Sequence, residues 1–121
     1  MKYALLLTND ASDVERWRTM TPEESDAARA TSMPKWLALF ERMEARGQSI
    51  SGLELEDPST AKTLRVVDGE VVVTDGPYAE TKELVGGLML VECADLDEAI
   101  ELAASIPLAS RGSVEIRPIV E

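Results

Sequence analysis

The densest group of chemically reactive side chains lies near the middle of the chain, between residues 75 and 83. Asp75-Gly76-Pro77 is a strong turn sequence, because Gly accepts positive φ, Pro fixes φ, and the Asp side chain can bond the backbone that follows it. The next six residues carry a phenol, a hydroxyl, an ammonium group and two carboxylates: Tyr78, Thr81, Lys82, Glu80 and Glu83. We therefore expect an ordered loop that could form one wall of a small-molecule pocket.

Two interpretations of these side chains remain open. As reacting groups, Asp75 could act as a general base, while Glu80 and Glu83 would share one face of a helical turn as an acid–base pair or a hard-cation site. As structural groups, Asp75 would complete the turn, Lys82 would neutralise a neighbouring carboxylate, and Tyr78 would pack beneath the loop. We take Asp75, Glu80 and Lys82 as candidate catalytic residues, and Tyr78 and Glu83 as candidate substrate-binding residues. We assign neither a metal ion nor a cofactor.

The charge balance limits the expected partners. The 121 residues include 23 acidic and 12 basic side chains, a formal net charge of -11, and the basic residues are not clustered. Binding to a nucleic-acid backbone or to an anionic membrane needs clustered Lys and Arg, so neither partner is expected. The length and the 45% hydrophobic content are typical of one globular domain, which we expect to span residues 1–121.

Two residue types that often carry chemistry are scarce. The sequence has no histidine, which removes the commonest general base at neutral pH and the commonest metal ligand. Cys93 is the single cysteine, so no intrachain disulfide can form, and its acidic neighbours Glu92 and Asp95 favour a structural thiol over a reactive one. The apolar run that ends at Leu7 is too short for a signal peptide, so a reducing cytoplasm is the expected location.

The first half of the chain predicts a strand followed by a long helix. Within residues 2–8, Tyr3, Leu5 and Leu7 would lie on one face of a strand, and Ala4 and Leu6 on the other. Apolar side chains on both faces predict a strand that is buried on both faces. A polar loop through Asp13 follows, with Val14 and Trp17 as packing anchors. Thr21-Pro22-Glu23-Glu24 has the form of a capping box, and Gly47 is a C-terminal cap. Pro34 predicts a kink or two abutting helices, and the expected core stripe is Met33, Trp36, Leu37, Phe40 and Met43.

The second half predicts mainly strands. Residues 48–56, 63–67, 70–74, 86–91 and 114–120 have strand patterns, and Asp68-Gly69 is typical of a two-residue type I′ hairpin turn. Gly86-Gly87 indicates a bulge or a close backbone approach rather than a phosphate site. Residues 94–105 predict a helix capped by Asp95, with its buried side formed by Leu96, Ala99, Ile100 and Ala103.

The order of these elements predicts an α+β, ferredoxin-like sandwich with an inserted β-hairpin. Two helices can cover one face of such a sheet. Because several strands are apolar on both faces, the second face needs a partner, and a second copy related by two-fold symmetry is the simplest one. We therefore expect a homodimer.

Several segments together resemble a known family. Val73 to Glu83 closely resembles the signature of the DGPF group of YCII-related proteins. Met1 to Leu7 resembles that family's first strand, Pro58 to Ala61 its central loop, Asp95 to Ala99 the start of its second helix, and Gly112 to Pro118 its last strand. The resemblance covers nearly the whole chain.

The resemblance implies a small cytoplasmic protein with a dimeric αβ-barrel fold. It also implies two functions of different kinds: a lyase-like enzyme of unknown substrate, or a non-catalytic module associated with an extracytoplasmic-function sigma factor. The chain departs from the wider family's His-Asp pair, because it has no histidine. Arg111 stands where relatives often carry His, so we add it to the candidate substrate-binding residues, and Tyr78 replaces the usual Phe.

Overall fold

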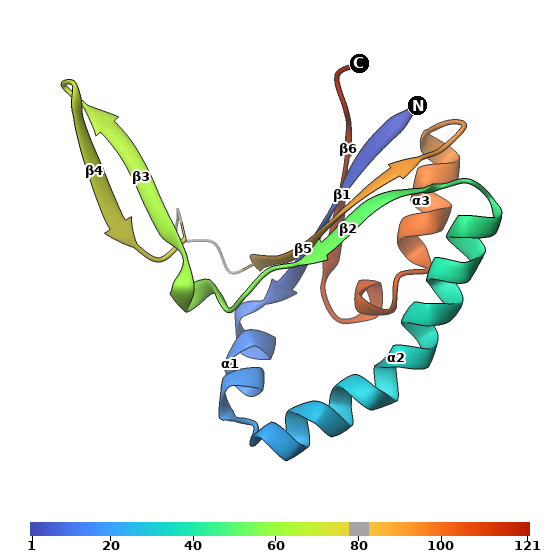
Figure 1. The fold of residues 1–121 in the computed structure, drawn as a ribbon, viewed down its shortest axis with the longest axis horizontal. Coiled ribbons are helices and arrows are strands. Elements are labelled where there is room, and N and C mark those ends of the chain that lie inside the picture. The colour runs from blue at the N-terminus through green and yellow to red at the C-terminus, as the bar shows by residue number, and fades with distance from the viewer. Residues whose placement is uncertain (78–82) are drawn as a thin grey trace.

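The computed structural model describes residues 1–77 and 83–121. In these residues three helices and a four-stranded sheet form the body, and a separate hairpin extends from it (Figure 1). The elements in chain order are β1 (Lys2–Asp10), α1 (Ala11–Thr19), α2 (Pro22–Ala45), β2 (Ser49–Glu54), the 3-10 turn η1 (Pro58–Thr60), β3 (Lys62–Val67), β4 (Glu70–Asp75), β5 (Glu83–Glu92), α3 (Leu96–Ala104), the 3-10 turn η2 (Pro107–Ser110) and β6 (Ser113–Pro118).

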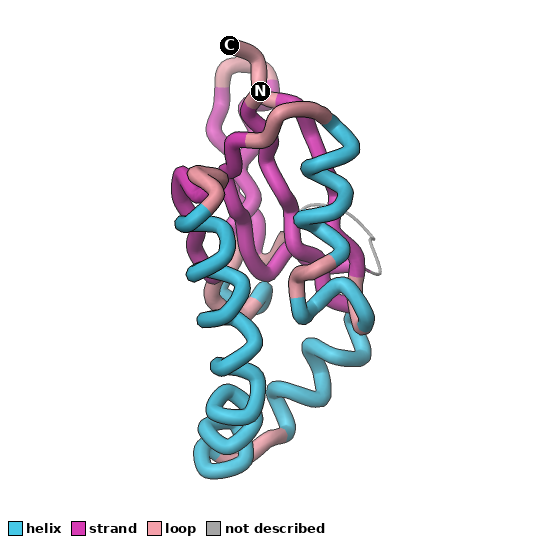
Figure 2. Tube along the Cα trace, turned by 90° about the vertical axis from the view of Figure 1, so that its right-hand side faces the viewer, coloured by secondary structure: helices cyan, strands magenta, loops and turns pink. Residues whose placement is uncertain are grey.

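The main sheet has the strand order β2-β5-β1-β6, and each neighbouring pair is antiparallel. Helices α2 and α3 lie on one side of this sheet (Figure 2). This α+β arrangement is compatible with the ferredoxin-like fold that the element order predicts.

The core lies between these helices and one face of the sheet. Tyr3, Leu5 and Leu7 of β1 are buried, together with residues of β5, α2 and α3: Met89, Val91, Leu39, Met43, Ala99 and Leu102. The alternate residues of β1 and β5 face the other side and are half-buried: Ala4, Leu6, Leu88 and Leu90. Among the described residues no helix covers this second face, so its full burial stays a prediction that depends on a partner.

Helix α1 corrects the prediction of a polar loop through Asp13. The Asp10 carboxylate accepts a hydrogen bond from the Ser12 backbone N–H at 2.8 Å, which caps the helix at its first turn. Val14 is buried and Trp17 is half-buried, as expected of packing anchors. The polar residues of this segment led to the prediction of a loop, whereas the Asp10 cap starts a helix there.

Helix α2 begins at the predicted capping box. Thr21 and Glu24 bond each other's backbone N–H groups, and Pro22 occupies the first turn. Gly47, at φ 67°, ends the helix as predicted. One continuous helix spans Pro34, and Figure 1 shows its axis curving along its length.

The apolar faces of both main helices differ from the predicted ones. In α2 the fully buried residues are Leu39 and Met43, whereas Met33, Leu37 and Phe40 are exposed. In α3 the buried residues are Ala99, Leu102 and Ala103, while Leu96 and Ile100 are about half exposed. Both helices carry more apolar side chains than one contact face can hold, so the packing angle decided which of them face the sheet.

The hairpin β3–β4 has the turn that Asp68-Gly69 predicts. Asp68 and Gly69 have φ values of 51° and 81°, and a type I′ turn requires positive φ at both central residues. Pairing runs from Lys62 opposite Asp75 to Val67 opposite Glu70. The two strands pair with each other and form a sheet of their own.

The bulge that Gly86-Gly87 predicts lies in β5. The register against β1 shifts between Leu7, opposite Gly87, and Thr8, opposite Val85. Strand β6 lies at the sheet edge and ends at Pro118, which agrees with the restriction that proline places on a strand.

Candidate functional site

The described part of the predicted loop begins at Asp75, the last residue of β4. Its carboxylate pairs with the Lys62 ammonium across the base of the hairpin, and 87% of the Asp75 side chain is exposed. Gly76 follows at φ 93°, and its N–H donates to the Ala61 carbonyl at 2.8 Å. Thr63 Oγ1 donates to the Gly76 carbonyl at 2.8 Å. The start of the loop is therefore anchored to the neighbouring strand, whereas Asp75 itself faces solvent.

The other predicted site residues are distributed differently. Tyr78, Glu80 and Lys82 lie outside the described residues. Glu83 opens β5 opposite Asp10, and Arg111 is exposed at the end of η2. Since Ser113 pairs with Thr8, the topology brings Glu83 and Arg111 to the same end of β1. Within the described chain, no ion pair joins Arg111 to Asp75.

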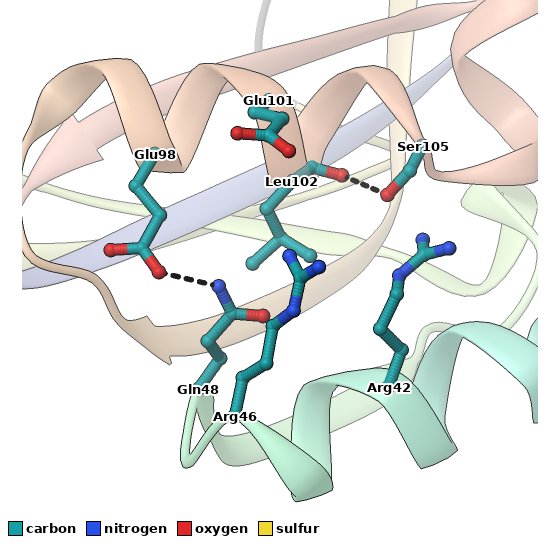
Figure 3. Close-up of a pocket in the computed structure, with 7 residues that line it drawn as sticks. All are labelled: Arg42, Arg46, Gln48, Glu98, Glu101, Leu102 and Ser105. Carbon is teal, nitrogen blue, oxygen red and sulfur yellow. Dashed lines mark hydrogen bonds between the residues drawn. The ribbon is translucent and has the colours of Figure 1, made fainter.

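A separate cleft of about 170 Å³ lies between the C-terminal half of α2 and helix α3 (Figure 3). None of its lining residues belongs to the described part of the predicted loop. Its lining residues come from two segments about fifty residues apart in the sequence: Arg42, Arg46, Gln48, Glu98, Glu101, Leu102 and Ser105.

Gln48 is the fixed centre of this cleft. The residue is 3% exposed, its N–H donates to the Met43 carbonyl at 2.8 Å, and its carbonyl accepts from the Glu92 N–H at 2.8 Å. Its side-chain Nε2 donates to Glu98 Oε1 at 2.8 Å. The chain thus leaves α2 through Gly47 and places one buried amide against α3.

Glu98 is held as a charged acceptor. The backbone N–H of Ala94 donates to its Oε2, and together with the Gln48 bond this holds the pKa of the Glu98 carboxyl below its ordinary value. Arg46 contributes to the same lowering through space. Glu98 therefore accepts a backbone hydrogen bond at the first turn of α3 and also forms part of the wall of the cleft.

The remaining charges of the cleft face each other across the two helices. Arg42 and Arg46, four residues apart, project from α2 toward α3, where Glu101 and Leu102 lie (Figure 3). In the described part of the chain neither guanidinium forms an ion pair. The cleft thus has a cationic wall, an anionic wall and one apolar contact.

Sequence reasoning missed the cleft. The available signals were Arg42 and Arg46 at helical i, i+4 spacing and Glu98 and Glu101 at i, i+3 spacing, each of which is common on solvated helices. Their proximity depends on how α2 and α3 pack. No local pattern encodes that.

A second cluster of charges fastens the helices to the far end of β2. Arg18 donates to both carboxylate oxygens of Asp57, and Arg29 pairs with Glu54 at 2.9 Å while lying 5.8 Å from the Trp17 ring centre. The Arg18 guanidinium, with the Ser59 backbone N–H, holds the pKa of Asp57 well below its ordinary value. These contacts are structural clamps between distant segments.

Among the residues that the structure describes, no group of three or more Cys, Asp and Glu side chains is arranged to hold a metal ion. The same residues include no helix that is long and apolar enough to cross a bilayer.

The fold and the comparisons with known proteins together define the class. The chain is an α+β protein with a four-stranded antiparallel sheet covered by helices on one face. The family model for the YCII-related domain matches residues 1–121, and the chain belongs to this family, as its sequence resemblance indicated. It is 37% identical over 122 residues to the uncharacterized protein R00369 of Rhizobium meliloti strain 1021, covering 98% of this chain and 92% of that protein.

Proposed function

We propose that this YCII-related chain works as a homodimer that binds a small molecule beside the segment Asp75–Glu83. The observation that carries the proposal is the unpartnered aliphatic surface of the hairpin and of the helix-free sheet face.

One face of the hairpin is aliphatic beyond the Lys62–Asp75 ion pair at its base. Cross-strand pairing places Leu64 opposite Val73 and Val66 opposite Val71, and each of these side chains is 56–65% exposed. A two-stranded hairpin alone is marginally stable in water, and four adjacent exposed aliphatic side chains favour a packing partner.

The helix-free face of the main sheet has the same character. Leu6 lies opposite Leu88, which lies opposite Leu53, so a row of leucines crosses three strands. Leu53 is about half exposed and the other two are half-buried. This row and the hairpin supply two apolar surfaces that a second copy would cover.

Charge favours a second copy that approaches through these faces. Each chain carries a formal charge of -11, so two copies repel wherever acidic side chains meet. The charged pair at the base of the hairpin, Lys62 and Asp75, is internally neutral. The aliphatic faces are therefore the surfaces of least repulsion.

The dimer would also bear on the ligand site. Asp75 is exposed in the single chain, and a wall over it would come from the partner, giving a pocket at the interface with Asp75, Tyr78 and Glu83 on one side. Lyase-like chemistry by Asp75, Glu80 and Lys82 is the enzymatic form of this proposal. The exposure of Asp75 and its pairing with Lys62 weigh against catalysis and favour the second candidate, a non-catalytic module, for which the family resemblance implies a sigma factor as the partner.

The mass of the protein in solution tests the assembly. Light scattering should give twice the mass of the 13.2 kDa chain at micromolar concentration, and Val66→Asp should give the single-chain mass. Val67→Asp is the matched control, because Val67 lies opposite Glu70 on the other face of the same hairpin. A single-chain mass for the unmodified protein, or equal dissociation by both variants, would contradict the proposal.

A further inference from the structure

The cleft between α2 and α3 is lined by side chains of both charges. Arg42 and Arg46 face it from one wall and Glu101 from the other, and none of the three forms an ion pair within the described chain. We propose that this cleft binds a free α-amino acid, with its carboxylate on the two arginines and its ammonium group on Glu101. This inference is independent of the proposed dimer and of the segment Asp75–Glu83.

The charges of the walls favour a zwitterion over a simple ion. A carboxylate suits a pair of guanidinium groups, whose planar N–H donors match its two oxygens. A ligand with negative charge alone would also meet Glu98, Glu101 and a protein of net charge -11. A ligand with positive charge alone would meet the two arginines. A molecule carrying both charges satisfies both walls.

The size of the cleft limits the ligand further. A volume of about 170 Å³ is below the range of about 300–1,000 Å³ typical of drug-sized pockets. Nucleotides and cofactors of that size are therefore disfavoured. Leu102 supplies an apolar contact for a short aliphatic side chain.

The cleft is also held in shape before any ligand arrives. Gln48 is fixed by backbone bonds on both sides and by its bond to Glu98, and Glu98 is fixed in turn by the Ala94 N–H. Ser105 Oγ donates to the Leu102 carbonyl at 2.6 Å. Each Glu98 oxygen already accepts a hydrogen bond, so Glu101 is the cleft carboxylate left to receive the ligand's ammonium group.

The sequence provides an unusually clean reporter for binding. Gln48 and Asn9 are the two side-chain amides in the 121 residues, so the Gln48 NH₂ signals can be identified in a proton–nitrogen NMR spectrum by comparison with Asn9→Ser. L-Alanine, titrated to about 50 mM, should shift the Gln48 signals in a saturable way, as a ligand of roughly millimolar affinity would. Propionate, which lacks the amine, and ethylamine, which lacks the carboxylate, should bind at least tenfold more weakly.

Variants test which side chains carry the effect. Arg42→Ala, Arg46→Ala and Glu101→Ala should each weaken alanine binding tenfold or more, and none of them adds a side-chain amide to the spectrum. Lys35→Ala and Glu44→Ala remove the same kinds of charge at exposed positions of α2 outside the cleft, and should leave binding unchanged. A dispersed, folded spectrum for every variant separates lost binding from lost structure.

Three results would overturn the proposal. No saturable shift with alanine would show that the cleft is a solvated ion cluster. Equal shifts with propionate would show a simple anion site. Unchanged binding in the arginine variants would place the amino acid elsewhere. These tests do not depend on whether the protein is a dimer, because the residues that line the cleft belong to one chain.

Discussion

Gly112 lies where the chain turns from η2 into β6 and passes close to the end of β1. A Cβ atom at Gly112 would lie 2.1 Å from the Thr8 carbonyl oxygen, far inside any tolerable contact, and that oxygen belongs to the backbone and cannot rotate away. The same strand end is fixed by Thr8 Oγ1, which donates to the Ser113 carbonyl at 3.1 Å. Glycine at this position is therefore a requirement of backbone approach.

Gly112→Ala should destabilise the fold by about 3 kcal/mol or more, because backbone must move to admit the methyl group. Gly52→Ala is the matched control within the same sheet, since its Cβ would meet Met89 Cγ at an ordinary 3.7 Å. Urea unfolding of both variants measures the difference. Equal stability of the two would mean that β6 can shift away from β1 at little cost.

Asp57 should make the protein sensitive to acid. Its pKa is lowered in the folded state by Arg18, so the stabilisation is fully present above the ordinary Asp pKa of about 3.9 and is lost as the pH falls below it. Asp57→Asn should thus lower Tm at pH 7. The difference in Tm between this variant and the unmodified protein should become smaller below about pH 4. Glu56→Gln, one residue away, should show no comparable narrowing. A gap that stays constant from pH 7 to pH 3 would show that the pairing with Arg18 adds nothing.

Asp75 has two roles to separate. If the segment Asp75–Glu83 walls a ligand pocket, Asp75→Asn should weaken binding by tenfold or more, about 1.4 kcal/mol, whereas Tyr78→Phe should cost little because Phe keeps the aromatic ring and stands at this place in the motif that the segment resembles. A thermal-shift screen of small acids and phenols supplies the ligand. If the Asp75→Asn variant is less stable but binds the ligand with unchanged affinity, then Asp75 is a turn residue paired with Lys62 and has no role in binding.

At the scale of elements, the long helix α2 tolerates a proline in its interior. Pro34 removes one backbone N–H from a helix that otherwise runs unbroken through 24 residues. Its side chain is exposed, so no core packing depends directly on the ring. The helix curves instead of breaking, which keeps Leu39 and Met43 against the sheet.

Pro34→Ala should therefore stabilise the protein by about 1–3 kcal/mol, since it restores the missing hydrogen bond and relieves the clash with the preceding turn. Thermal melts followed by circular dichroism measure it, with Lys35→Ala as the exposed neighbouring control. A lower Tm for Pro34→Ala would mean that the curvature itself is needed to bring Leu39 and Met43 onto the core.

At the scale of the whole molecule, the single chain exposes many aliphatic side chains, although it has a packed core between the helices and one face of the sheet. The hairpin and the leucine row of the sheet point to assembly, and an assembled protein gains stability with concentration. Tm should rise by about 5 °C or more for a hundredfold increase in concentration. Val66→Asp should abolish the dependence and Val67→Asp should retain it. A Tm independent of concentration for the unmodified protein would argue against the dimer.

The sequence by itself determined the features that depend on neighbouring residues. The Thr21 capping box, the Asp95 cap, the Gly47 helix end and the Asp68-Gly69 turn all lie where the residues predict, because each is closed by hydrogen bonds or φ values within a few positions. Membership of the YCII-related family was equally readable, since the segment from Val73 to Glu83 and the shorter segments that carry the resemblance are each continuous in the sequence.

Tertiary structure alone decided which side chains face the core and which meet in the α2–α3 cleft. Leu39 was selected over Leu37 and Phe40 by the angle at which α2 crosses the sheet, because an apolar helix surface wider than one contact face does not fix its own orientation. Arg46 and Glu98 meet across fifty residues for the same reason: their proximity follows from two helices packed on one sheet.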